Sequence, residues 1–181
     1  MRVGIVSDTH DRTDSIAAVV ALLRQQAIEV VFHCGDIESV RTVGQFVGFQ
    51  MHFVLGNWDG DWITGVNCGL ASRAPDGRKR DATRLRNAVA DLGGRLHEPW
   101  GDLELEGRQI GWVHGDNREL LKELEQSGCY DFLFYGHTHI AEQHRTGRTL
   151  VINPGALFRI YPQSFALLDL QSGTVESVTL R

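Results

Sequence analysis

Short runs of β-branched residues alternate with amphipathic helix patterns over the first third of the chain, and few folds have this order of secondary-structure elements. After the first run, apolar residues recur at i, i+3, i+4 and i+7, which is the spacing of one buried helix face. Strand, helix, strand, helix, strand is the signature of βαβ units, so we predict a parallel sheet. The predicted elements are strands at 3–6, 30–32 and 51–55 and helices capped by Thr13 and Ser39.

The pattern is lost after Asn57 and returns in a different form. Residues 61–80 show no clear period and contain three glycines and a proline, so we predict an irregular insertion there. A helix follows from about Asp81 and stops at Gly93-Gly94. The remaining chain is rich in strands, and we expect residues 1–181 to form a single domain. The further predicted elements are strands at 103–105, 110–113, 132–135, 143–145, 149–152, 165–170 and 175–180 and a helix at 117–127.

The overall composition excludes several classes of protein. The formal net charge of −5 does not favour a nucleic-acid or anionic-membrane partner. No apolar run approaches the roughly 20 residues that a membrane span needs, and the first residues do not form a signal peptide. The three cysteines lie far apart and form no CxxC motif, which is typical of a reducing compartment. We therefore expect a cytoplasmic protein that binds neither membranes nor nucleic acid.

Metal-capable side chains are concentrated at the ends of five predicted strands. Parallel strands place their carboxyl ends on one edge of a sheet, where open α/β sheets bind ligands. Carboxylate, amide and imidazole groups together suit Mn, Fe, Zn, Ni or Co better than Ca or Mg, which prefer oxygen ligands alone. The five segments are Asp8-Thr9-His10, Gly35-Asp36, Gly56-Asn57-Trp58-Asp59, His114-Gly115-Asp116 and Gly136-His137-Thr138-His139.

In this order, DxH, GD, GNxD, HG and GHxH resemble the motifs of the calcineurin-like metallophosphoesterase superfamily. The resemblance extends from Asp8 to Gly155. The short chain and the Asn153-Pro154-Gly155 segment after GHTH are similar to its small single-domain bacterial and archaeal phosphodiesterases. The resemblance implies an α/β fold, a four-layer α/β/β/α sandwich of two mixed β-sheets flanked by helices. It also implies metal-dependent hydrolysis of a phosphate ester, with a diester favoured over a monoester.

The resemblance further implies two divalent metal ions about 3.5–4 Å apart. Mn²⁺ is the first expectation, and Ni²⁺, Fe²⁺, Zn²⁺ and Co²⁺ are the alternatives. A hydroxide bridging the two ions would attack phosphorus in line with the leaving group, and Asp36, Asn57 and His114 would act as catalytic residues. By position in the motifs, Asp8, His10 and His139 would hold one ion, Asn57, His114 and His137 would hold the other, and Asp36 would bridge them.

Two positions depart from the family pattern. Trp58 stands where many members carry a histidine that protonates the leaving group, and an indole cannot transfer a proton at ordinary pH. We therefore expect activated esters with acidic leaving groups to be preferred. Asp116 allows two interpretations: an acid–base group beside His114, or the N-cap of the next helix, which we favour. Trp58, Asp116 and Arg159 are the candidate contacts to a small phosphate-ester substrate, for which a nucleotide is one option.

The alternative function is non-catalytic. Some members of the superfamily serve as protein-interaction scaffolds with degraded metal sites, and a phosphate-binding or nucleotide-binding protein is a third option. All seven ligand positions match in this chain, which favours the enzyme. A homo-oligomer and a phosphate-binding role for the basic residues at 61–86 stay open. His33, close to Asp36 in the sequence, is the remaining histidine that we expect to orient a ligand.

Overall fold

Two mixed β-sheets form the centre of the computed structural model, which describes residues 1–59, 61–63 and 79–180. The larger sheet has the strand order β13-β12-β1-β2-β3-β6, and β1, β2, β3 and β6 run parallel to one another. Its strands are β1 (Arg2–Val6), β2 (Val30–His33), β3 (Gln50–Val54), β6 (Arg95–His97), β12 (Ser164–Asp169) and β13 (Val175–Thr179).

The smaller sheet has the order β10-β11-β9-β8-β7, with β8, β9 and β11 parallel. Its strands are β7 (Trp100–Leu105), β8 (Arg108–Val113), β9 (Phe132–Phe134), β10 (Glu142–Thr146) and β11 (Thr149–Asn153). Within the described residues, the helices are α1 (Thr13–Gln25), α2 (Val40–Gln45), α3 (Thr83–Asp91) and α4 (Arg118–Gln126).

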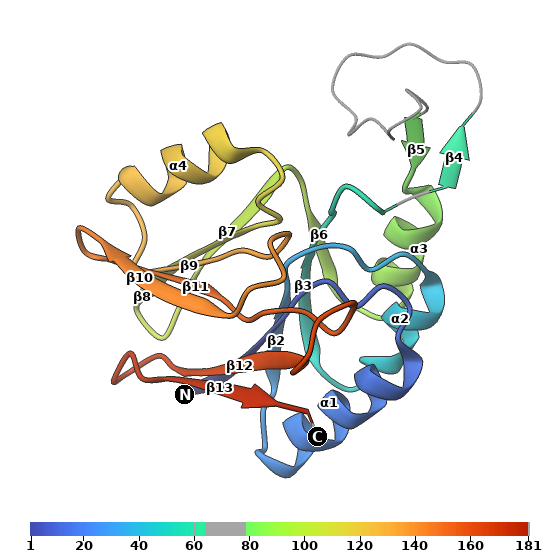
Figure 1. Ribbon diagram of the computed structural model, residues 1–181, viewed down its shortest axis with the longest axis horizontal. Helices are drawn as coiled ribbons and strands as arrows, with labels where there is room; N and C mark the ends of the chain where they lie inside the picture. Colours follow the sequence, from blue (N-terminus) through green and yellow to red (C-terminus); the bar gives the residue numbers. More distant parts are fainter. Residues whose placement is uncertain (60, 64–78, 181) are drawn as a thin grey trace.

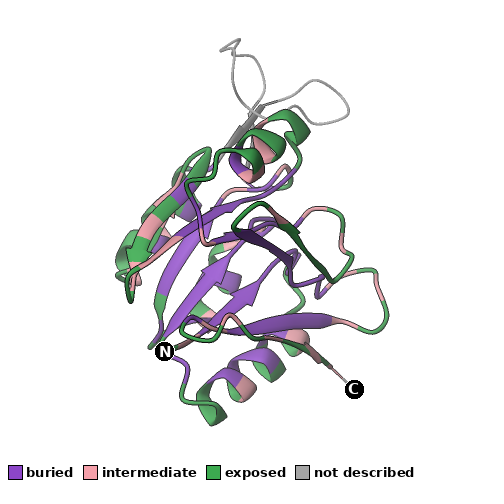
Figure 2. Cartoon of the chain, turned by 90° about the vertical axis from the view of Figure 1, so that its left-hand side faces the viewer, coloured by how far each residue is buried: buried purple, intermediate pink, exposed green. Residues whose placement is uncertain are grey.

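The sheets pack face to face and are covered on their outer sides by helices (Figure 1). Between the sheets, the ring of Phe32 lies 4.9 Å from that of Trp112 and 5.2 Å from that of Phe134. The helices α1, α2 and α3 pack their apolar residues on the outer face of the larger sheet, and α4 packs Leu124 on the smaller sheet. Figure 2 shows the buried strands at the centre and exposed residues on the outer helix faces. The predicted four-layer α/β/β/α sandwich is confirmed.

The apolar patterns located the long elements well, because burial alone explains them. In α1, the four buried residues are the ones that recur at helical spacing: Ile16, Val19, Val20 and Leu23. Ser39 caps α2 as predicted, accepting hydrogen bonds from the N–H groups of Arg41 and Thr42. In the part of the chain that the structure describes, no helix is long and apolar enough to cross a membrane.

Several local predictions were wrong. Thr13 is the first residue of α1, and Arg12 stands at the N-cap without a side-chain cap bond. Asp116 does not cap α4, because Asn117 takes that place and accepts the N–H of Leu120 at 3.1 Å. The short strand β6 at the end of the parallel array was not predicted.

The insertion predicted at 61–80 is not irregular at its two ends. The strands β4 (Asp61–Ile63) and β5 (Lys79–Asp81) pair antiparallel, which closes the segment at its base. The rest of that prediction falls on residues 64–78, which lie outside the described residues, as do the basic positions among them.

A buried histidine between the sheets makes the stability of this fold depend on pH. His52 is 1% exposed, stacks on Phe32 at 5.2 Å, and its Nδ1 has no hydrogen-bond partner among the described residues. Burial, together with the charges of His97 and Arg95, lowers the pKa of His52 to about 4 from its usual 6.5. The unfolded chain therefore takes up a proton near pH 6.5 that the folded protein accepts only near pH 4.

We expect the free energy of unfolding of the metal-free protein to fall as the pH drops from 6.5 to 4. The variant His52→Phe keeps an aromatic ring against Phe32 but removes the titrating group, so its stability should fall less steeply over this range. Urea unfolding at a series of pH values measures both slopes. Equal slopes for the variant and the wild type would contradict this prediction.

Candidate metal centre

The loops that follow five parallel strands meet at one edge of the sandwich. The loop after β1 is held to the loop after β2 by backbone hydrogen bonds, with the N–H of Asp8 donating to the carbonyl of Gly35 at 3.0 Å. The loops after β8 and β9 are joined through the N–H of Gly136 and the carbonyl of His114. The N–H of His137 donates to Asp8 Oδ2 at 3.0 Å, which joins the two sheets at this edge.

The first group of side chains consists of Asp8, His10, Asp36 and His139. One ligand-type atom from each lies within 4.8 Å of all the others. His10 Nε2 lies 3.3 Å from Asp36 Oδ2, and His139 Nε2 lies 3.3 Å from Asp8 Oδ1. Asp8, His10 and Asp36 are buried, whereas the side chain of His139 is 25% exposed. The group is therefore closed on the protein side and open towards solvent at His139.

The second group is centred on the Asn57 side chain. Its Oδ1 lies 2.9 Å from His114 Nε2 and 3.1 Å from His137 Nδ1. His114 Nε2 also lies 3.5 Å from Asp36 Oδ2, the same oxygen that faces His10 in the first group. Asp36 therefore stands between the two groups.

The donor atoms of both groups fit a cation. Asp8 Oδ1 and His10 Nε2 are buried and have no hydrogen-bond partner among the described residues, although a buried unpaired polar atom is costly. His114 Nδ1 lies 2.8 Å from the carbonyl of Cys34, which places a proton on Nδ1. In the neutral ring, Nε2 and the Asn57 oxygen are then two acceptors facing each other. A metal ion between them would satisfy both acceptors.

The backbone of this edge is unusually strained. Five of the seven residues in the two groups have a positive φ, between 40° and 65°, a region that non-glycine residues seldom adopt. Such conformations cluster at functional sites, where surrounding contacts enforce them. The five are Asp8, His10, Asp36, His137 and His139.

Close packing at two glycines excludes any side chain there. A Cβ atom on Gly56 would collide with the carboxylate and backbone nitrogen of Asp36. A Cβ atom on Gly136 would collide with the hydroxyl of Ser7 and lie 2.7 Å from Asp8 Oδ2. The glycines in the GNxD and GHxH segments therefore allow the loops to come close enough for the seven side chains to converge.

The charged groups of the cluster shift one another's pKa values. Burial by itself lowers the pKa of His10, but the neighbouring carboxylates of Asp36 and Glu38 outweigh it and raise the pKa to about 9. Burial likewise opposes the shift of His114, whose pKa is raised by the charges of Asp36 and Asp8. Burial raises the pKa of Asp36, but the neighbouring His10 ring and the charge of His114 outweigh it and lower that pKa. Without a metal ion, protons supply the positive charge that the carboxylates require.

The sequence-predicted substrate contacts lie around this cluster. The N–H of Trp58 donates to Asp36 Oδ1 at 2.8 Å, and its ring centroid is 6.1 Å from that of His10. The guanidinium of Arg159 lies over the ring of Phe158, whose centroid is 4.4 Å from that of His10. Asp116 is exposed. Burial lowers the pKa of His137, and the charge of Asp116 opposes that shift only in part.

Two acidic residues at the site had no assigned role in the sequence. Glu38 Oε1 lies 2.6 Å from His10 Nδ1. Asp59 is 3% exposed, and its carboxylate accepts the backbone N–H groups of Ile37, Glu38 and Gly56. Burial and the charge of Asp36 raise the pKa of Asp59 to about 6, although the hydrogen bonds from Glu38 and Gly56 oppose the rise. Their positions beside the motifs were the one signal in the sequence: Glu38 follows the GD motif, and Asp59 is the last residue of GNxD.

His33 has a contact of the kind expected from the sequence. Its Nε2 lies 3.1 Å from Thr9 Oγ1, and that hydroxyl donates to the carbonyl of Asp36. Thr9 is the middle residue of the DxH segment, so His33 contacts this segment between its two proposed ligands. Its effect on a bound ion stays a prediction.

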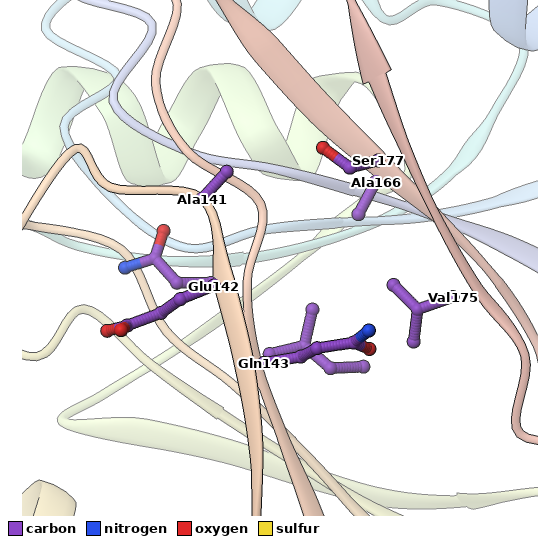
Figure 3. Close-up of a pocket in the computed structure, with 8 residues that line it drawn as sticks. Ala141, Glu142, Gln143, Ala166, Val175 and Ser177 are labelled. Carbon is purple, nitrogen blue, oxygen red and sulfur yellow. The ribbon is translucent and has the colours of Figure 1, made fainter.

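A separate pocket of about 220 Å³ lies among β10, β11, β12 and β13 (Figure 3). One of its lining residues, Asn153, donates to the carbonyl of Gly136 and to the Thr138 hydroxyl, so this pocket lies behind the GHxH loop. It contains none of the seven side chains described above.

Comparisons with known proteins found a matching family and a relative. The family model of the calcineurin-like phosphoesterase superfamily domain matches residues 1–173. Phosphodiesterase MJ0936 of Methanocaldococcus jannaschii is 29% identical over 157 residues, which are 86% of this chain and 83% of that protein.

Solved structures show the same fold. A structure described as a novel archaeal phosphodiesterase superposes with a TM-score of 0.83 at 24% identity and covers 99% of this chain and 100% of its own. YfcE, a phosphoesterase from E. coli, gives a TM-score of 0.66 at 20% identity, and Vps29 from Entamoeba histolytica gives 0.62 at 20%. Both of these cover 100% of each chain.

Metal binding at this centre should release a proton. Since the pKa of His10 is raised to about 9, its ring is protonated at neutral pH in the metal-free protein, and an ion that binds through Nε2 must displace that proton. Affinity for a divalent ion should therefore rise with pH, roughly tenfold per unit for this one proton.

Titration calorimetry with Mn²⁺ at neutral pH, in buffers of different ionisation enthalpy, measures the release. We expect the observed heat to change with the buffer by an amount that corresponds to about one proton or more. A heat of binding that is independent of the buffer would contradict the assignment.

Proposed function

The chain belongs to the calcineurin-like phosphoesterase superfamily, and we propose that it hydrolyses a phosphodiester with two divalent metal ions held in the cluster described above. The observation that carries the proposal is the position of Asp36, whose Oδ2 lies 3.3 Å from His10 Nε2 and 3.5 Å from His114 Nε2. One carboxylate oxygen thus faces ligand-type atoms of both groups, as a bridging ligand requires. The relative from Methanocaldococcus jannaschii, itself named a phosphodiesterase, supports the choice of a diester.

Each residue of the cluster has a proposed role in metal binding. Asp8, His10 and His139 would hold one ion, Asn57, His114 and His137 would hold the other, and Asp36 would contact both. Two cations in such a centre activate a water as nucleophile and offset the charge on the phosphoryl oxygens. The mixed nitrogen and oxygen donors suit Mn²⁺, and also Ni²⁺, Fe²⁺, Zn²⁺ or Co²⁺.

His114 and Asn57 have a second task beyond holding an ion. The bond from His114 Nδ1 to the Cys34 carbonyl fixes the ring so that Nε2 points at Asn57 and Asp36. The Asn57 amide group extends from the same loop as Trp58 and is partly exposed, so its NH₂ can reach a phosphoryl oxygen of a bound ester. Asp36, Asn57 and His114 are therefore the proposed catalytic residues.

The rim of the site determines which esters react. Trp58 is 43% exposed and Arg159 is exposed, and both lie beside the His10 ring or its neighbour Phe158. We propose that Arg159 binds the negatively charged phosphate of the ester and that Trp58 contacts its organic group. Asp116, which is not needed as a helix cap, adds negative charge beside His114 and His137. The proposed substrate is a small phosphodiester, and a nucleotide is one candidate. The proposed location of the enzyme is the cytoplasm.

The direct test is turnover by metal-free protein after reloading with Mn²⁺, Ni²⁺, Zn²⁺, Co²⁺ or Mg²⁺, against matched series of phosphodiesters and phosphomonoesters. We expect diester hydrolysis to return with the transition metals and to be lost in Asp36→Asn, which removes the shared carboxylate. Absence of turnover with every metal and ester would favour a binding protein or scaffold of this fold instead.

The role given to Trp58 can be tested by varying the leaving group of the ester. Because indole donates no proton in catalysis, kcat/KM should fall steeply as the pKa of the leaving alcohol rises. Trp58→His places an imidazole there and should raise kcat/KM for alkyl leaving groups by roughly 10²-fold, while acidic phenols gain little.

The matched control is Trp58→Phe, which keeps an aromatic ring but adds no titrating group. It should retain the steep dependence of the wild type. A wild-type rate that does not vary with the leaving group would refute the role given to Trp58.

A further inference from the structure

The His10 ring is held from both sides by carboxylates. Its Nδ1 lies 2.6 Å from Glu38 Oε1, and its Nε2 lies 3.3 Å from Asp36 Oδ2. Phe158 packs against the ring at 4.4 Å, and the side chain is only 3% exposed. Nε2 nevertheless has no hydrogen-bond partner among the described residues. One nitrogen of the ring is therefore fully engaged, and the other is left directed at the ligand cluster.

The contact with Glu38 determines which ring nitrogen carries the proton. A carboxylate accepts hydrogen bonds, so Nδ1 donates its proton to Glu38 and the lone pair of the neutral ring is placed on Nε2. A histidine that binds a metal ion through one nitrogen commonly donates from the other to a carboxylate, which orients the ring and makes it a stronger ligand. Glu38 has the position and chemistry of that outer partner.

Glu38 is itself fixed by a buried carboxylate. Its φ of +69° is in the left-handed region, and its N–H donates to Asp59 Oδ1 at 2.7 Å. The other oxygen, Asp59 Oδ2, accepts the N–H of Gly56 at 2.7 Å. Asp59 thus fastens the loop after β2 to the loop after β3 and holds Glu38 in a conformation that it would rarely adopt alone.

We propose that Glu38 is a positioning residue that sets the tautomer and orientation of His10 for metal binding. Glu38 touches neither the ester nor the ion, and it acts through the imidazole. The inference rests on the proposed function only in that His10 binds a metal ion, so it can be tested without turnover.

A purely structural role for Glu38 makes a different prediction. The Glu38 side chain is 32% exposed, and a pair of this kind contributes little to folding stability because solvent screens it. Loss of the Glu38 carboxylate should therefore affect metal affinity much more than the melting temperature of the metal-free protein.

The experiment compares Glu38→Ala and Glu38→Gln with the wild type by titration calorimetry of the metal-free proteins with Mn²⁺. Glu38→Ala should weaken binding at one of the two sites by about 10- to 100-fold and leave the other site less affected. Glu38→Gln should recover most of that loss, since its amide oxygen still accepts the proton of Nδ1. The visible spectrum of the Co²⁺-loaded proteins should change in the same order.

The matched control is Ser39→Ala, which removes the cap of α2 and the hydrogen bond from Ser39 to Asp11 but leaves the contact between Glu38 and His10 in place. It should lower the melting temperature and leave Mn²⁺ affinity unchanged. Wild-type affinity in Glu38→Ala, or equal losses of affinity in Glu38→Ala and Ser39→Ala, would overturn the proposal. Failure of the wild type to hydrolyse any ester, with metal binding intact, would overturn the proposed function and not this inference.

Discussion

One buried carboxylate, Asp36, joins the two halves of the molecule. It follows β2 in the larger sheet, receives an N–H from the loop after β3, and faces imidazoles that follow β1 and, across the sandwich, β8. A buried carboxylate is costly unless positive charge or hydrogen bonds surround it. These groups come from several loops, and the strand order determines which loops can reach Asp36.

The fold could be predicted from the sequence where burial alone determines the structure. The apolar residues of α1 recur at helical spacing because one face packs on the larger sheet. Prediction failed where neighbours compete for the same role. Both Asp116 and Asn117 can cap α4, and only the path of the loop after β8 selects Asn117. The strand β6 has three residues and only partial burial, so no alternation of polar and apolar residues marked it.

The residues of the candidate site could also be predicted from the sequence only in part. Its seven ligand-type residues stand out because aspartate, asparagine and histidine follow strands in five short motifs, four of which also contain glycine. Glu38 and Asp59 did not stand out, because acidic residues are common in loops. Their roles depend on contacts that cross from one loop to another, such as the bond from Ile37 N–H to Asp59, 22 positions further along the chain. Tertiary contacts of this kind leave little trace in a single sequence.

The left-handed backbone of the ligand loops has a consequence for how such a chain can evolve. At Asp8, His10, Asp36, His137 and His139, a replacement must satisfy the local backbone as well as the chemistry of the centre. Asparagine and aspartate tolerate this conformation, whereas β-branched residues resist it. Even a lineage that abandoned catalysis would therefore drift first towards small or amide side chains at these places. The remains of an old active site would persist as a pattern of turns long after its reactivity had gone.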